Sequence, residues 1–245
     1  MPEGPSLVIL REEAAKFAGR RVKHVGGNSR LDIQRMAGQR VQALRTWGKH
    51  FLVVFDDFTL RVHFLLWGSY RIDERREGSA ERLALGFPNG ELNLYSSSLK
   101  FLEGDLDELY DWGADVMSDA WDPKAARRKL RAMPDTLAAD ALLDQDVFAG
   151  VGNIIKNEVL FRIRVHPETS VGALSPRKLG ELVTQAREYS FDFYRWKKDY
   201  VLKKHYQVHT RTECPRCGRR LEFRAKLGRA QRRAFFCGHC QKRYG

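Results

Sequence analysis

The stretch from Cys214 to Cys240 reads CPRCGRRLEFRAKLGRAQRRAFFCGHC, and it contains all four cysteines of the chain. Nineteen residues separate its two Cys-x-x-Cys pairs, a spacing typical of a hairpin that folds onto a tetrahedral zinc ion. A module this small cannot bury a core of its own, so the metal would supply much of its folding free energy. The spacing therefore predicts one structural zinc, bound by Cys214, Cys217, Cys237 and Cys240.

Basic residues crowd this stretch and are in excess over the whole chain. Lysine and arginine outnumber aspartate and glutamate by 43 to 31, which gives a formal net charge of +12. Such an excess favours a polyanionic partner, and cations gathered on one small hairpin favour contact with phosphates. The alternative is a zinc ribbon that only fastens the C-terminal segment, with its charges solvated. The cations of the hairpin are Arg216, Arg219, Arg220, Arg224, Lys226, Arg229, Arg232 and Arg233.

Hydropathy argues against a membrane protein. No apolar run approaches the roughly 18 residues that a spanning helix needs. The longest run, residues 51–55, is predicted to be a buried strand. The N-terminal sequence MPEGP lacks the charged and apolar regions of a signal peptide. We therefore expect an intracellular protein with reduced thiols, in the cytosol or nucleoid if the cell is bacterial, and no membrane partner.

Upstream of the cysteines, the chain changes from strand-rich to helix-rich at about residue 104. The first part predicts a helix over residues 6–17 and then a β-sandwich or barrel of short strands. The second part predicts a helical lobe. We expect an α+β fold with domains 1–104, 105–206 and 207–245: an N-terminal helix plus two-layer β-sandwich, the helical lobe and the zinc hairpin. The expected strands cover 41–45, 51–55, 60–64 and 92–95, and the expected helices 122–130, 137–147, 153–161 and 175–194.

A glycine-rich turn, Gly150-Val-Gly-Asn153, lies between two of the expected helices. Its glycines allow positive φ and close backbone approach, and Asn153 can cap the helix that it begins. The N–H groups at a helix N-terminus form an anion site that suits a DNA phosphate. The alternative is an ordinary tight turn between helices.

Position 2 offers a nucleophile. Removal of Met1 would expose the secondary amine of Pro2, and an α-amino group titrates near pH 8, so a useful fraction of it is neutral at physiological pH. Such an amine can attack C1′ of a deoxyribose, expel the base and leave an iminium, which makes the C2′ proton acidic and allows β-elimination. Glu3 could move protons to the ring oxygen and from the amine. The alternative is a proline that follows the first methionine by chance.

Four motifs follow one another in a recognisable order. They are MPEGP at residues 1–5, WGKH at 47–50, GVGNIIKNE at 150–158 with VHP at 165–167, and the four-cysteine ribbon. In this combination the chain resembles the formamidopyrimidine-DNA glycosylase/endonuclease VIII family of base-excision-repair enzymes from Pro2 to Gln241. The resemblance implies a bifunctional DNA glycosylase and AP lyase that acts on damaged DNA. It also implies a helix–two-turn–helix in the helical lobe.

The same resemblance implies roles for single residues. Pro2 corresponds to the Schiff-base nucleophile of the family, and Glu3 to its catalytic acid and base. Lys49 corresponds to a lysine of the active site that contacts the phosphate beside the lesion. Asn153 corresponds to the phosphate-binding asparagine of the helix–two-turn–helix, and Arg232 to the zinc-finger arginine that contacts the phosphates flanking the damaged nucleotide.

The segment HFLLWG, residues 63–68, lies where the family carries its void-filling residues. Leu65, Leu66 and Trp67 resemble the contiguous triplet of the endonuclease VIII branch. An apolar wedge at this place is physically reasonable, because a flipped base leaves an unstacked gap in the duplex. The alternative is a buried strand.

Two departures bear on the substrate. Ser6 stands where family members usually have a second glutamate, so an auxiliary carboxylate is in doubt. Residues 196–205 leave no room for the longer excursion that the branch excising 8-oxoguanine carries before its zinc module. We therefore expect oxidised pyrimidines to be preferred, with cleavage of the abasic site by β/δ-elimination.

Two other functions remain open from the sequence. The first keeps the chemistry but acts on oxidised purines or on bulkier lesions such as crosslinks. The second is a non-catalytic zinc-ribbon protein that binds bent or gapped DNA, and the adjacent Pro2 and Glu3 argue against it. In each case we expect a monomer that binds duplex DNA or a single strand.

Overall fold

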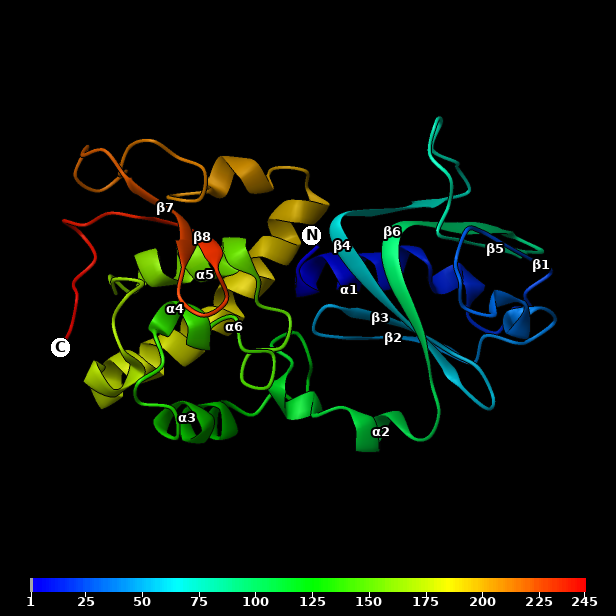
Figure 1. Cartoon of the computed structure of the whole chain (residues 1–245), viewed down its shortest axis with the longest axis horizontal. Coiled ribbons are helices and arrows are strands. Elements are labelled where there is room, and N and C mark those ends of the chain that lie inside the picture. The colour runs from blue at the N-terminus through cyan, green and yellow to red at the C-terminus, as the bar shows by residue number, and fades with distance from the viewer. Residues whose placement is uncertain (1) are drawn as a thin grey trace. The chain divides into compact units, whose positions relative to one another are not determined.

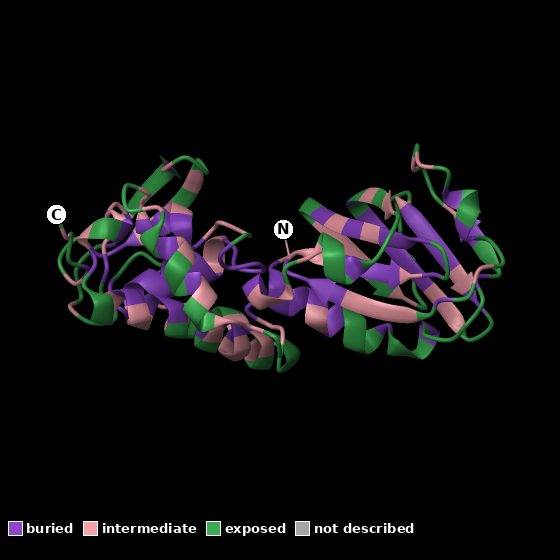
Figure 2. Cartoon of the chain, turned by 90° about the horizontal axis from the view of Figure 1, so that it is seen from below, coloured by how far each residue is buried: buried purple, intermediate pink, exposed green. Residues whose placement is uncertain are grey.

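The computed structural model describes residues 2–245, which fold as two compact units, the first ending at Tyr110 and the second covering Asp111–Gly245. Figure 1 shows strands dominating the first unit and helices the second. Buried residues are found on the helices and strands of both units (Figure 2). Within the described residues, no helix is long and apolar enough to cross a membrane. Removal of Met1, which the sequence predicts, concerns a residue outside those described.

The first unit consists of an N-terminal helix and a six-stranded antiparallel sheet in the order β1-β5-β6-β4-β3-β2. Helix α1 packs against β2 and β3. The four strands expected from the sequence correspond to β2, β3, β4 and β6. The elements are α1 Gly4–Glu13, β1 His24–Gly26, β2 Ala43–Trp47, β3 His50–Val54, β4 Thr59–Ile72, β5 Leu83–Phe87, β6 Gly90–Leu102 and α2 Leu106–Leu109, with short 3-10 helices at Ala15–Phe17 and Ile33–Met36.

An irregularity in the long strand β4 divides the sheet into two halves. Its pairing with β6 shifts between Phe64 and Ser69, so the first half of β4 lies beside β3 and the second half continues the sheet towards β5. Both halves contribute to one core, in which Phe51, Leu60 and Leu85 pack with Leu10 of α1. The helix and sandwich expected for this part of the chain are confirmed.

The second unit is helical and includes the cysteine hairpin. Asp122 and Ser175 cap their helices, each followed by a proline, as Ser175-Pro176 predicts. Leu227 and Phe236 of the hairpin belong to the same core as the helices. The elements are α3 Pro123–Arg131, α4 Ala138–Ala141, α5 Asn153–Arg162, α6 Pro176–Lys198, β7 Glu222–Leu227 and β8 Arg232–Phe236, with 3-10 helices at Trp112–Ala114, Val171–Ala173 and Leu202–His205.

The helix predicted over residues 137–147 is wrong beyond Ala141, where α4 ends. The Asp144 carboxylate accepts the backbone N–H of Asp146, and the Gln145 amide donates to the Leu143 carbonyl and accepts the Gly150 N–H. Side chains that bond nearby backbone in this way favour turns over a continued helix. The apolar spacing of the segment reflects burial in a looped conformation.

Candidate active site, metal centre and nucleic-acid interface

Pro2 and Glu3 directly precede helix α1. Glu3 is the N-cap residue of this helix, with an extended backbone, and the Ser6 N–H donates to its carbonyl at 2.8 Å. Its side chain is only 4% exposed, whereas Pro2 is half-buried. The partial positive charge at a helix N-terminus stabilises a carboxylate placed there. The fold therefore holds an acid beside the residue whose amine is the predicted nucleophile.

Lys49 lies in the turn that joins β2 to β3. Trp47 pairs with His50 across a two-residue hairpin turn, and Gly48, the first residue of that turn, has a φ of 52°. Tight hairpins need such a left-handed residue, and glycine adopts it without strain. Because α1 packs against both strands of this hairpin, Lys49 and the Pro2–Glu3 pair are held on directly packed elements of one unit.

Two histidines beside Lys49 lie within the quoted motifs WGKH and HFLLWG, but the sequence reasoning gave them no role. His63 Nδ1 lies 3.2 Å from the Lys49 carbonyl oxygen, and His50 Nδ1 lies 3.1 Å from the Tyr110 hydroxyl. Burial, with the positive charge of Arg61 as a further cause, lowers the pKa of His50 to about 3, and burial also lowers the pKa of His63. Both imidazoles are therefore neutral at physiological pH. The β3–β4 register pairs the two histidines, and no local motif signals this.

The apolar triplet of β4 is exposed. Leu65, Leu66 and Trp67 are 49%, 59% and 80% exposed, at the place where β4 loses its register with β6. A Cβ on Gly68 would lie 2.7 Å from Cβ of Phe64, closer than real side chains come, so the tight backbone here needs glycine. The alternative of a buried strand is contradicted for these three side chains. Three adjacent apolar groups in water favour an interaction surface.

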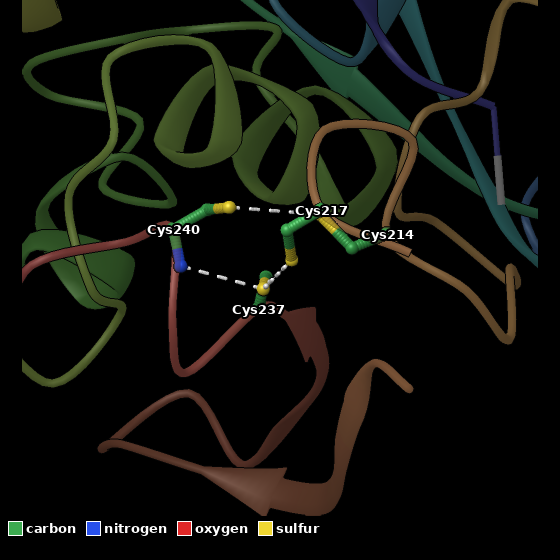
Figure 3. Close-up of side chains that lie close together, drawn as sticks. All are labelled: Cys214, Cys217, Cys237 and Cys240. Carbon is green, nitrogen blue, oxygen red and sulfur yellow. Dashed lines mark hydrogen bonds between the residues drawn. The ribbon is translucent and has the colours of Figure 1, made fainter. Parts of the chain in front are cut away.

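The four cysteine sulfurs converge on one point (Figure 3). Cys214 and Cys240 bring their Sγ atoms to 3.8 Å, Cys217 and Cys237 theirs to 3.7 Å, and all four Sγ atoms lie within 4.8 Å of one another. A tetrahedral ion with metal–sulfur bonds of about 2.3 Å separates its thiolates by about 3.8 Å. The donor set and its spacing therefore fit a four-coordinate metal site.

The local backbone supports both cysteine pairs. In the first pair the Gly218 N–H donates to the Cys214 carbonyl, and Gly218 adopts a φ of 68°. In the second pair the Cys240 N–H points at Cys237 Sγ at 3.4 Å, and the Cys237 N–H donates to the buried Gln241 side chain at 2.8 Å. An N–H directed at sulfur stabilises a thiolate, as a bound cation requires.

The turn before α5 differs from the expectation in one detail. The N-cap residue is Gly152, and Asn153 is the first residue of the helix, so Asn153 does not cap it. The Asn153 side chain instead accepts a hydrogen bond from Lys156 Nζ at 2.9 Å. Gly150 has a φ of 98°, so the positive φ predicted for this turn is confirmed.

The hairpin cations do not all have the same role. Arg232 begins β8, pairs with Leu227 and is half-buried. Arg216 donates to the carbonyls of Phe161 and Arg162 at the end of α5 and lies 4.0 Å from the Phe161 ring, so it serves the packing of the unit. In this conformation two donors of the Arg216 guanidinium are used within the unit, and its contact with a phosphate stays a prediction.

Comparison with known proteins matches the chain to two family models. The formamidopyrimidine-DNA glycosylase N-terminal domain matches residues 1–101, and the H2TH domain of the same proteins matches residues 112–189. The mouse protein endonuclease 8-like 3 is 32% identical over 213 residues, which are 84% of this chain and 35% of the mouse protein. This chain thus spans about a third of the length of the endonuclease 8-like 3 proteins that it matches.

Other relatives match from end to end. Endonuclease 8 2 of Mycobacterium tuberculosis is 29% identical over an aligned length of 269 residues, gaps included. The alignment covers 99% of this chain and all of that protein. The solved structure of formamidopyrimidine-DNA glycosylase from Lactococcus lactis, bound to DNA containing an abasic site, superimposes with a TM-score of 0.85 at 23% identity. It covers 98% of this chain and 100% of that chain, so the two folds are the same.

Proposed function

Because the chain belongs to the formamidopyrimidine-DNA glycosylase/endonuclease VIII family, we propose that it is a bifunctional DNA glycosylase and AP lyase of base-excision repair. Its proposed substrate is DNA that contains an oxidised base. Because that DNA lies inside the cell, we propose that the protein is intracellular. The observation that carries the proposal is the pairing of Pro2 with a buried Glu3 at the start of α1. A protein that only bound DNA would need neither residue.

The proposed chemistry needs the free amine of Pro2, and therefore the removal of Met1. The start of α1 two residues later favours the neutral form of this amine. The amine attacks C1′, the bond to the base breaks, and the departing base takes a proton from water. Glu3 accepts the proton of the attacking amine and passes it to the ring oxygen, so that the C1′–O4′ bond breaks and the iminium forms. Loss of a C2′ proton from the iminium then expels the 3′ phosphate, a second elimination expels the 5′ phosphate, and water releases the sugar fragment.

Three basic or amide side chains are proposed as phosphate ligands, namely Lys49, Asn153 and Arg232. Each replacement by alanine is expected to weaken DNA binding about equally on all sequences, because phosphates carry no sequence information. In log Kd against log salt concentration, loss of Lys49 or Arg232 flattens the slope by about one, whereas loss of neutral Asn153 lowers affinity at nearly constant slope. A loss that depends on base sequence would contradict the assignment.

The exposed triplet is proposed to fill the gap that a flipped nucleotide leaves. Replacing Leu65, Leu66 and Trp67 together by alanine should slow excision from duplex DNA, because base–aromatic stacking contributes roughly 1–3 kcal/mol per base. Excision from single strands should change much less, since little unstacking is needed there. The melting temperature should stay within a few degrees, because these side chains are exposed. An unaltered ratio of duplex to single-strand rates would refute the wedge.

We propose zinc as the occupant of the four-cysteine site, one ion per chain with a structural role. Four thiolates at tetrahedral spacing leave no open position for a substrate or water, so no catalytic step is assigned to the ion. When bound, it cross-links the two cysteine pairs. The hairpin cations, with Arg232 first among them, then have a rigid base from which to reach phosphates.

Oxidised pyrimidines are the proposed lesions. Helix α6 ends at Lys198, and only a short 3-10 helix, Leu202–His205, separates it from the hairpin segment, which leaves no long loop to cover a flipped purine. The deciding experiment is borohydride trapping, which reduces the iminium to a stable protein–DNA link, on oligonucleotides with single defined lesions. If trapping is faster on oxidised purines or crosslinks than on oxidised pyrimidines, those lesions are the preferred substrates and the proposed lesion class is wrong. An absence of trapping on every lesion and on abasic DNA would refute the proposed glycosylase and AP-lyase activity.

A further inference from the structure

Helix α5 carries a row of buried polar side chains that the proposed chemistry does not use. Lys156 is only 1% exposed, and its ammonium donates to Asn153 Oδ1 at 2.9 Å and to the backbone carbonyl of Arg233 at 2.8 Å. One buried cation therefore joins the start of α5 to strand β8. Burying an ammonium is costly unless its hydrogen bonds are made, so a lysine at this place calls for a reason beyond packing.

The chemistry of the two groups decides how the Asn153 amide is turned. A lysine ammonium has three donors and no acceptor, so only the carbonyl oxygen of the amide can face it. The NH₂ group of Asn153 must then face the opposite way, where it offers donors only. A group that presents only donors at a helix N-terminus suits an anion and rejects a donor.

We propose that Lys156 is a positioning residue for DNA binding: it turns the Asn153 amide so that its NH₂ faces the phosphate, and it holds β8 beside α5. The inference rests on the proposed phosphate contact of Asn153 and names the residue on which that contact depends. Through the Arg233 carbonyl, the same ammonium fixes the strand on which Arg232 lies. Asn153 on α5 and Arg232 on β8, both proposed phosphate ligands, are thus held in place by the same Lys156 ammonium.

A double-mutant cycle tests the dependence, with binding measured on duplex DNA that carries a tetrahydrofuran abasic-site analogue. We expect Asn153→Ala to weaken binding about ten-fold, the range for a hydrogen bond to a charged group. Lys156→Met should weaken binding by a similar factor in the wild-type protein. In the Asn153→Ala protein it should cost no more than about three-fold, because the amide that it orients is already absent.

Asp140→Ala is the matched control. The Asp140 carboxylate accepts the N–H groups of Arg229 and Ala230 in the β7–β8 turn, so it also docks the hairpin, but it has no bond to Asn153. Its effect on binding should be the same with and without Asn153. Melting temperature and zinc content, measured for every variant, identify any protein that has lost the hairpin fold.

Asn153→Asp tests the amide orientation without removing Lys156. The carboxylate keeps the bond to the ammonium but presents an anionic oxygen where the NH₂ group stood. We expect this variant to bind DNA more weakly than Asn153→Ala while melting no lower than the wild type.

The outcomes separate the two proposals. If Asn153→Ala binds like the wild type, the phosphate role proposed for Asn153 is wrong. If Asn153→Ala weakens binding but Lys156→Met is fully additive with it, or if Asn153→Asp binds as well as Asn153→Ala, Lys156 does not position the amide, and the phosphate role of Asn153 stands without it.

Discussion

A protein whose Pro2 amine is blocked, by retained Met1 or by an uncleaved N-terminal extension, is expected to give no borohydride-trapped complex with DNA. The lone pair of an amide nitrogen is delocalised into its carbonyl and cannot attack C1′, so neither base release through the iminium nor strand cleavage can follow. Pro2→Gly leaves a primary amine and should retain weak trapping. The measurement is the yield of cross-linked protein on DNA containing an oxidised pyrimidine, beside the same yield on abasic DNA.

DNA binding by the blocked protein is the control for this experiment. The blocked protein should bind the tetrahydrofuran duplex within about three-fold of the processed protein, because the proposed phosphate ligands are untouched. Glu3→Gln provides a second variant, with excision slowed by about 10²–10⁴-fold, the usual contribution of a positioned acid or base. Trapping by the blocked protein at the normal yield would show that another amine is the nucleophile.

Removal of the metal is expected to abolish specific DNA binding. In Cys237→Ser the Sγ that lies 3.7 Å from Cys217 is gone, and the remaining three thiolates bind zinc less tightly. Because Leu227 and Phe236 of the hairpin belong to the core of the second unit, we expect that unit to melt at a lower temperature as well. Elemental analysis should give about one zinc per chain in the wild type and much less in the variant.

Chelation followed by added zinc separates the effect of losing the metal from the effect of the Cys237→Ser substitution. Binding and melting temperature should both fall on chelation and return with one equivalent of zinc, because folding of such a module is coupled to its metal. A zinc-free preparation with full activity would overturn the structural role.

Local patterns predicted those parts of the molecule that depend on residues close in sequence. Cys-x-x-Cys spacing located the metal site, and Ser175-Pro176 located the start of α6. The sandwich followed from short apolar segments and turn residues. Hydropathy could not predict the exposure of residues 65–67, because it depends on a register shift against a strand about thirty residues away.

The polar residues of α5 illustrate the same limit. A lysine, an asparagine and a glutamate in succession suggest solvent-exposed positions, yet Lys156, Asn157 and Glu158 are all buried. Each of them bonds to a residue at least 49 positions away, and the distant partners of Lys156 and Glu158 are backbone atoms, which no side-chain pattern in the sequence reveals. The assignment of Asn153 as a helix cap failed for another reason: Gly152 is the N-cap residue of α5, and Asn153 is already the first residue of the helix.

Backbone docking has an evolutionary consequence for the hairpin. The Glu158 carboxylate accepts the N–H groups of Gln207, Val208 and His209, and Asp140 and Lys156 likewise bond to main-chain atoms of the hairpin. Every residue type except proline supplies such N–H groups, and every residue supplies a carbonyl. Mutations in the solvent-facing side chains of the hairpin should therefore accumulate without undocking it. Natural variation can then change the proposed phosphate contacts of the hairpin while the bonds that attach it stay the same.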